Sequence, residues 1–431
     1  MDGLNALMAH PMHVEAFSAI ERLITDLRAC RTPEDFHTFQ QDLLTQLLEI
    51  ETHRAACARV IKRLRNGRTV PGDAPDIRSS AELPPLKRFG LEADACERVA
   101  RQLRSVGDAL AWRAFNFQRD FIVTLSRNDT PGPMANKKGL AAELAFVERS
   151  WREDRTFALL HDLTNCLRIG DASAFVADGV QLREIKTDPT RRQPAQLRRV
   201  NAAIASLTSG APLPRDGQRP VRLNIPYVTH LKTLREVANL AAERGVRGAK
   251  VQGGRALTVA CLPKAQNLWS EEEFGQQFDR ERRGAMRRAG LGDPNYVTFG
   301  SLDRAARAPA DPPWAIYPLH PLVCAGFITD RLVFVSSIGG DSVVAALAAA
   351  GLTARWNHRN TLDGPVDLSQ PILDVHNGRR RMSMNYAEIN RLLLELVDLH
   401  VWVEQIRVIL ADNRLEGAPW PYFDNERAVW T

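Results

Sequence analysis

The chain has 431 residues, of which 44% are hydrophobic and 25% are charged, and its formal net charge at pH 7 is +6. This balance excludes global disorder and low-complexity classes, and the length predicts about two to four domains, each with its own core. The basic excess permits nucleic acid or another polyanion as a partner without requiring one.

The sequence contains no run of the roughly 18 apolar residues that a membrane-spanning helix needs, and its N-terminus lacks the pattern of a signal peptide. The six cysteines lie far apart and none has CxxC spacing, so neither a zinc ribbon nor a redox motif is predicted. We therefore expect a cytoplasmic protein with reduced thiols and no membrane association.

A helical N-terminal domain is predicted over 1–130. Thr32, followed by Pro33 and two acidic residues, is typical of a helix start, and apolar residues continue at helical spacing to Arg65. A stretch rich in proline and glycine separates this helix from a second one, predicted over 92–125. We expect these helices to form a structural scaffold, and DNA binding and partner binding are the alternatives.

The next segment alternates between helices and short strands. It predicts a helix that begins at Gly139, with Glu143 in its first turns, and then short strands, a further helix and a further strand. Asp178-Gly179 is a hairpin turn between strands at 172–177 and 180–187.

Three polar side chains are expected to meet at one end of this hairpin. Because side chains alternate along a strand, Glu184 and Lys186 share one face, and Ile185 between them points toward the core. The antiparallel partner strand brings Asp171, near its start, close to both residues. Two carboxylates and an ammonium group would then converge.

This trio suits the hydrolysis of a phosphodiester bond. Carboxylate oxygens are ligands for Mg²⁺, or for Mn²⁺ in its place, so Asp171 and Glu184 are the candidate metal ligands. The metal activates a water molecule and polarises the phosphoryl oxygen. Lys186 would orient that water or stabilise the developing charge.

The order of these residues resembles the PD-(D/E)xK, or restriction-endonuclease-like, nuclease superfamily. Asp171 is followed thirteen residues later by Glu184-Ile185-Lys186, although Gly170 stands where the family's name has proline. The resemblance covers only 139–227, where it implies a first helix over 139–152, a first strand over either 157–162 or 165–169, a second helix over 194–207 and a last strand over 221–227. It implies an α/β (α+β) core with a central mixed sheet, in which a fourth strand joins a three-stranded meander, and we assign this nuclease core to 131–300.

The resemblance also implies two accessory residues. Glu143 matches an additional catalytic acid on the first helix, and Gln196, or else Gln193, matches a glutamine at the start of the second helix. Taken singly, each residue of the site has an ordinary structural explanation, such as an exposed strand pair or a turn. Their joint order is what favours a site.

Positive charge gathers around the candidate catalytic strand. From Arg183 to Arg222 there are nine basic residues and three acidic ones. Contacts with a nucleic-acid backbone are predicted for Arg191, Arg192, Gln196, Arg198 and Arg199. A solvated helix face is the alternative explanation of such a charge run.

A mixed C-terminal region is predicted over 301–431. It includes a buried strand at Leu332–Val335, a helix at Ser342–Leu352 and one long apolar helix over Tyr386–Ala411, which would pack in the core or between two copies of the chain.

Together these features predict a metal-dependent endonuclease. DNA is the expected substrate over RNA, by resemblance, and restriction-type antiviral defence or repair is the expected setting. A second copy of the chain or an activating protein is a further expected partner. One alternative is a catalytically inactive nuclease-fold module that binds nucleic acid or protein, and another is a helical interaction protein in which the motif is accidental. No P-loop, HExxH or GxSxG motif offers a competing chemistry.

Overall fold

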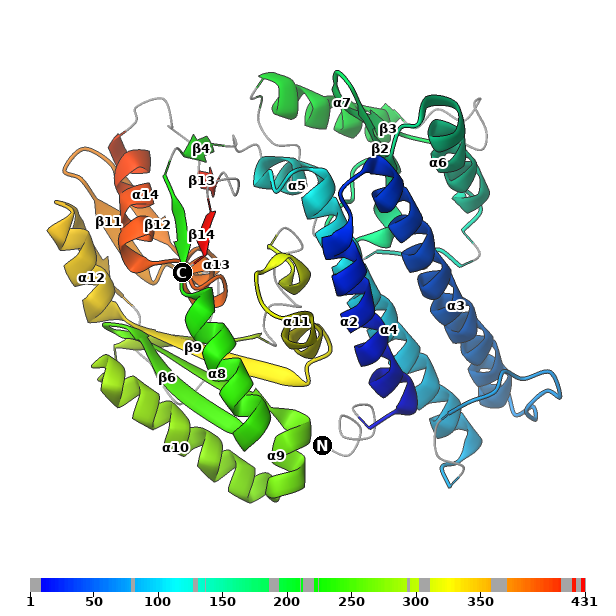
Figure 1. Ribbon diagram of the computed structural model, residues 1–431, viewed down its shortest axis with the longest axis horizontal. Helices are drawn as coiled ribbons and strands as arrows, with labels where there is room; N and C mark the ends of the chain where they lie inside the picture. The colour runs from blue at the N-terminus through cyan, green and yellow to red at the C-terminus, as the bar shows by residue number, and fades with distance from the viewer. Residues whose placement is uncertain are drawn as a thin grey trace. The chain divides into compact units, whose positions relative to one another are not determined.

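The computed structural model describes residues 9–78, 82–126, 131–135, 137–185, 194–209, 211, 221–223, 225–292, 295–301, 311–357, 370–411, 421–423 and 428–430. The chain is a mixed α/β protein that divides into two compact units (Figure 1). The first unit comprises Met1–Asn116, Phe121–Arg215 and Pro313–Ile316, and the second comprises the rest. The boundaries predicted at 130 and 300 do not separate these units, and the three-domain division stays a prediction.

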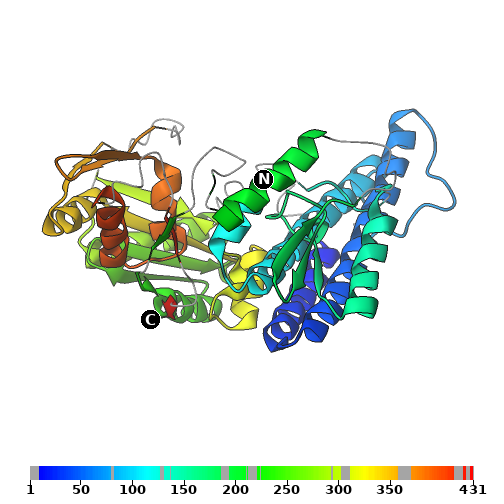
Figure 2. The same ribbon diagram turned by 90° about the horizontal axis from the view of Figure 1, so that it is seen from above.

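The helical N-terminal region is confirmed. Helices α2 (Pro11–Ala29), α3 (Pro33–Arg65) and α4 (Pro85–Ala114) lie side by side in the first unit (Figures 1 and 2). Thr32 caps α3 as predicted: its hydroxyl accepts the Asp35 N–H, and the Asp35 carboxylate accepts the Thr32 N–H at 2.8 Å.

The second predicted helix, over 92–125, is wrong in its bounds. The chain forms α4 and then the separate α5 (Arg119–Leu125). Between them, Asn116 and Phe117 have φ angles of 51° and 59°, which a continuous helix does not allow. Because this left-handed stretch contains neither proline nor glycine, the sequence pattern did not indicate it.

The first unit also contains a small antiparallel sheet in the order β1-β2-β3, flanked in the sequence by two helices. The first of the two alternative strand positions is confirmed, and so are the hairpin and the helix near 194–207. Strand β3 ends at Arg183, earlier than predicted, because Arg183 pairs with Ala172, the first residue of β2. The elements are α6 (Leu140–Asp154), β1 (Ala158–Leu160), β2 (Ala172–Val176), β3 (Gly179–Arg183) and α7 (Pro194–Ser209).

The last strand predicted for this core, over 221–227, does not join the sheet. It is replaced by two short strands of the second unit, β4 (Val221–Leu223) and β5 (Tyr227–Thr229). Their parallel partners are β13 (Pro421–Phe423) and β14 (Ala428–Trp430). Since the hydrogen bonds of 221–223 go to the C-terminal strand, the described part of the chain shows a three-stranded antiparallel sheet rather than the central mixed sheet.

A four-stranded antiparallel sheet in the order β6-β7-β9-β8 forms the centre of the second unit. Ala256 and Tyr296 on one of its faces pack against Ala285 and Met286 of α10. The predicted strand at 332–335 and the helix near 342–352 are confirmed as β9 and α12. The elements are α8 (Leu231–Arg244), β6 (Val246–Gln252), β7 (Arg255–Cys261), α9 (Leu262–Leu268), α10 (Glu271–Ala289), β8 (Tyr296–Gly300), α11 (Pro321–Ile328), β9 (Leu332–Gly339), α12 (Gly340–Ala349), β10 (Thr353–Trp356), β11 (Leu373–His376) and β12 (Arg381–Met384).

The long C-terminal helix is two helices, α13 (Tyr386–Leu394) and α14 (Leu399–Ala411). The break has a physical cause, because Leu396 has a φ of 53° and Val397 makes a β-bridge with Thr229. Asp398 then starts α14 by accepting the N–H of His400 at 2.9 Å. None of the described helices is long and apolar enough to cross a membrane.

Candidate catalytic site

Asp171 is held against the backbone of Glu184. Its N–H donates to the Arg183 carbonyl at 2.8 Å, and its Oδ2 accepts the Ile185 N–H at 2.7 Å. Glu184 therefore lies between two residues that both bind Asp171. The structure thus places Asp171 beside the backbone of 183–185, whereas the predicted convergence of the Asp171, Glu184 and Lys186 side chains stays a prediction.

Gly170 and His161 fix the position of Asp171. Gly170 has a φ of +78°. Proline cannot adopt this conformation, because the proline ring locks φ near −65°. The Gly170 carbonyl can only accept, so Nδ1 of the buried His161 donates to it at 3.1 Å, and Nε2 accepts the Ser173 hydroxyl at 2.8 Å. Burial lowers the pKa of His161 to about 4, which keeps the ring neutral in this role.

Glu143, the candidate accessory acid, is 2% exposed in the first turn of α6. Its Oε1 lies 2.7 Å from Lys137 Nζ, whereas the buried Oε2 has no hydrogen-bond partner in the described part of the chain. Burial raises the pKa of Glu143, and the charges of Asp162 and Asp171 raise it further against the effect of Lys137. The structure thus brings Glu143 into the electrostatic field of Asp171.

Sequence reasoning missed Lys137 and Asp162. Lys137 Nζ lies 2.6 Å from Asp162 Oδ2 while it contacts Glu143, and it joins the residues before α6 to the turn that follows β1. Burial alone would lower the pKa of Lys137, but Asp162 and Glu143 raise it, so the ammonium stays charged. The sequence did offer one indication of Asp162. If 157–162 pairs antiparallel with 172–177, Asp162 and Asp171 lie at the same end of that strand pair.

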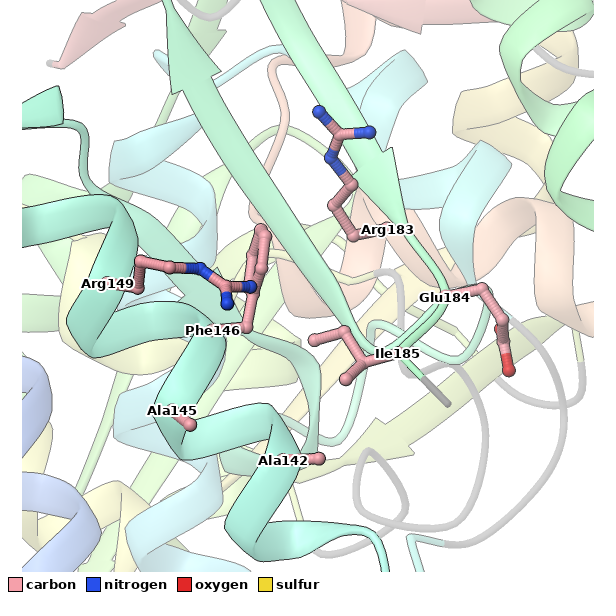
Figure 3. Close-up of a pocket in the computed structure, with 7 residues that line it drawn as sticks. All are labelled: Ala142, Ala145, Phe146, Arg149, Arg183, Glu184 and Ile185. Atoms are coloured by element: carbon pink, nitrogen blue, oxygen red, sulfur yellow. The ribbon is translucent and has the colours of Figure 1, made fainter. Parts of the chain in front are cut away.

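Glu184 lines an open pocket between α6 and the end of β3 (Figure 3). Figure 3 shows Ile185 pointing toward α6, whereas the Glu184 carboxylate points away from that helix. Ile185 is half-buried and faces the pocket, although we expected it to face the core. Glu184 and Ile185, which follow the end of β3, thus still point to different sides, and a pocket takes the place of the core on the Ile185 side.

Several predicted residues are not placed. Lys186, Arg191 and Arg192 lie outside the described residues, and Gln196 belongs to α7 with no side chain described. Arg198 and Arg199 belong to α7 as well, the first exposed and the second half-buried. Their proposed contacts with nucleic acid stay predictions.

The carboxylates present fit a Mg²⁺ ion in their chemistry. Within the described ranges, no three His, Cys, Asp or Glu side chains are placed to hold a metal by themselves. Magnesium needs fewer protein ligands, because it keeps several waters and is bound by one or two carboxylates. The buried Oε2 of Glu143 is the kind of acceptor that a bound cation or its water would satisfy.

No protein-family model, no curated protein and no solved structure matches this chain. What the site does is therefore inferred from its residues and their geometry.

Proposed function

We propose that this protein is a Mg²⁺-dependent (or Mn²⁺-dependent) nuclease of the PD-(D/E)xK type, acting on DNA. The observation that carries the proposal is the 2.7 Å hydrogen bond from the Ile185 N–H to Asp171 Oδ2, which holds Asp171 at the ExK segment. Glu143 supports the proposal as well, because this carboxyl group is buried and its pKa is raised by burial and by the charges of Asp162 and Asp171.

The chain's own residues have distinct parts in this chemistry. Asp171 and Glu184 would hold the metal ion, and Glu143 would accept a hydrogen bond from its water. The ion supplies polarisation of the phosphoryl oxygen and activation of water. Lys186 would orient the attacking water, and Lys137 would keep Glu143 and Asp162 together despite their like charges. The basic residues of 183–222 would hold the phosphate backbone.

Restriction-type defence against invading DNA, or repair, is the setting we propose, and the possible partners are an activating protein and a second copy of the chain. DNA is preferred over RNA on the resemblance of the motif alone.

Cleavage of duplex plasmid DNA, of single-stranded DNA and of single-stranded RNA with Mg²⁺ or Mn²⁺ tests the proposal. Glu184→Gln, Asp171→Asn and Lys186→Met should each lower the rate by roughly 100-fold or more, since each removes a charge used in the reaction. Glu153→Gln, an exposed residue of the same helix as Glu143, is the matched control and should cleave like wild type. Equal rates in all variants would overturn the assignment of the site.

The alternative is a nuclease-fold module that binds without cleaving. Thermal unfolding with and without Mg²⁺ separates the two, because a ligand that binds only the folded state raises its stability. Mg²⁺ should stabilise wild type but not the Asp171→Asn, Glu184→Gln double variant. If wild type neither cleaves nor gains stability from the metal, the non-catalytic module replaces the nuclease.

A further inference from the structure

The pocket beside Glu184 has a chemistry that the metal site does not use. It has a volume of about 450 Å³ and is lined by the aromatic Phe146, by apolar Ala142, Ala145 and Ile185, and by the cationic Arg149 and Arg183. We propose that it binds one unpaired nucleotide next to the bond to be cleaved, so that the substrate is single-stranded DNA. This inference rests on the nuclease function proposed above.

The walls of the pocket suit a base. Phe146 is half-buried on α6, and Ile185 points toward α6 from the end of β3 (Figure 3). A base between them would stack on the ring of Phe146 and contact the aliphatic side chain of Ile185. Stacking on an aromatic side chain tolerates every base, so the pocket would not select a sequence. Its volume lies within the roughly 300–1,000 Å³ of small-molecule sites.

The two arginines suit the phosphates on either side of that base. Arg149 comes from α6 and Arg183 from β3, and both are exposed. Arg149 makes no ion pair with the described residues, and Arg183 donates to the Gln181 side chain, so no described carboxylate neutralises either charge. A guanidinium binds phosphate oxygens bidentately. Glu184 belongs to the lining of the pocket, although its carboxylate points away from α6, so the bound nucleotide would lie beside one proposed metal ligand.

A base-paired nucleotide cannot use these walls. In a duplex each base is stacked between neighbours, and it reaches such a pocket only after it is extruded, at a cost of roughly a few kcal/mol. A single strand already exposes its bases. The pocket therefore favours an unpaired strand, whereas contacts with phosphates alone would bind both forms.

Binding by the full chain tests this in EDTA, where no divalent metal is present and cleavage does not occur. Fluorescence anisotropy compares a labelled 20-nucleotide DNA strand with the same sequence as a duplex at one salt concentration. We expect the single strand to bind at least about tenfold tighter, and Phe146→Leu to lose about tenfold for the single strand but little for the duplex. The Arg149→Gln, Arg183→Gln double variant should weaken single-strand binding.

Arg152→Gln is the matched control, because Arg152 is an exposed arginine of α6 that pairs with Glu148 outside the pocket. It should bind both probes like wild type. Equal affinity for the two forms, or full single-strand binding by Phe146→Leu, overturns the inference. If these variants behave as expected but wild type never cleaves with metal, the pocket stands and the nuclease proposal fails. If wild type cleaves duplex as well as single strand, the pocket proposal alone fails.

Discussion

At the scale of single residues, Glu143 combines burial with an unsatisfied carboxylate oxygen. Burial first, and then the charges of Asp162 and Asp171, raise its pKa against the effect of Lys137, so a further cation at Oε2 would stabilise the ionised form. We expect Glu143→Gln to lower metal-dependent cleavage by roughly 10- to 100-fold, as loss of a group beside a metal typically does.

The same variant should keep its stability without metal, because the amide carries no charge to desolvate. Cleavage rates and thermal unfolding of Glu143→Gln and of the control Glu153→Gln provide the measurement. A Glu143→Gln protein that cleaves like wild type would remove Glu143 from the site.

His161 should make the stability of the first unit depend on pH. Its pKa falls from an ordinary 6.5 to about 4 on burial, so the folded state resists protonation more than the unfolded state does. Stability is therefore complete above pH 6.5 and declines as the pH falls toward 4. The full loss is about 3 kcal/mol, from 1.36 kcal/mol for each tenfold change in the proton equilibrium.

Urea unfolding between pH 7 and pH 4 measures this effect. The non-titrating variant His161→Gln should show a flatter pH dependence than wild type, and the difference between the two curves isolates the histidine. If the stability of wild type and of His161→Gln changed equally with pH, burial would not be keeping the His161 ring neutral.

At the scale of elements, two glycines of α4 offer a matched pair. A Cβ on Gly107 would lie 1.9 Å from the carbonyl oxygen of Leu163, which is backbone and cannot rotate away. A Cβ on Gly90 would meet nothing within 4 Å. Gly107 is thus where α4 approaches the turn after β1.

We expect Gly107→Ala to lower the free energy of unfolding by about 1–3 kcal/mol or more, because the backbones must move apart. Gly90→Ala should be neutral or stabilising by up to about 1 kcal/mol through helix propensity. Circular dichroism during urea unfolding measures both, and equal effects would contradict the close approach.

At the scale of the whole molecule, each unit has its own buried polar anchor. In the first unit, Glu92 of α4 accepts from the Arg78 N–H at 2.9 Å and lies 3.1 Å from the ring nitrogens of both His10 and His53. In the second unit, Arg119 binds both carboxylate oxygens of Glu395, at 2.9 and 3.1 Å. These anchors join segments that are far apart in the chain.

Arg119→Met should destabilise the second unit by about 3–5 kcal/mol, because the buried Glu395 carboxylate loses a positively charged partner. Arg407→Gln, which breaks the exposed pair with Glu404, should cost less than about 1 kcal/mol. Hydrogen exchange resolved by segment measures both. Faster exchange in the amides of β6, β7 and β9 is expected for Arg119→Met alone, and unchanged exchange there would contradict this role.

The sequence indicated the hairpin beside the candidate site and less of the sheet around it. The hairpin at Asp178-Gly179, which follows from a few neighbouring residues, brings Asp171 beside the backbone of Glu184, whereas the meeting of their side chains with Lys186 stays a prediction. The nuclease core as a whole was not recovered, because its fourth strand finds its partner elsewhere. Lys137 was missed because a lysine in a proline-rich connection carries no periodic signal.

By itself, the sequence determined the features that depend on near neighbours: the cap at Thr32, the tight hairpin and the helix near 194–207. Only the tertiary structure decided that Lys137 joins Glu143 to Asp162, that Val221–Leu223 pairs with Pro421–Phe423, and that Leu396 interrupts the C-terminal helix. The physical reason is the same in each case. These outcomes depend on which distant segment satisfies a charge or a backbone hydrogen bond, and a local pattern of residues does not specify that partner.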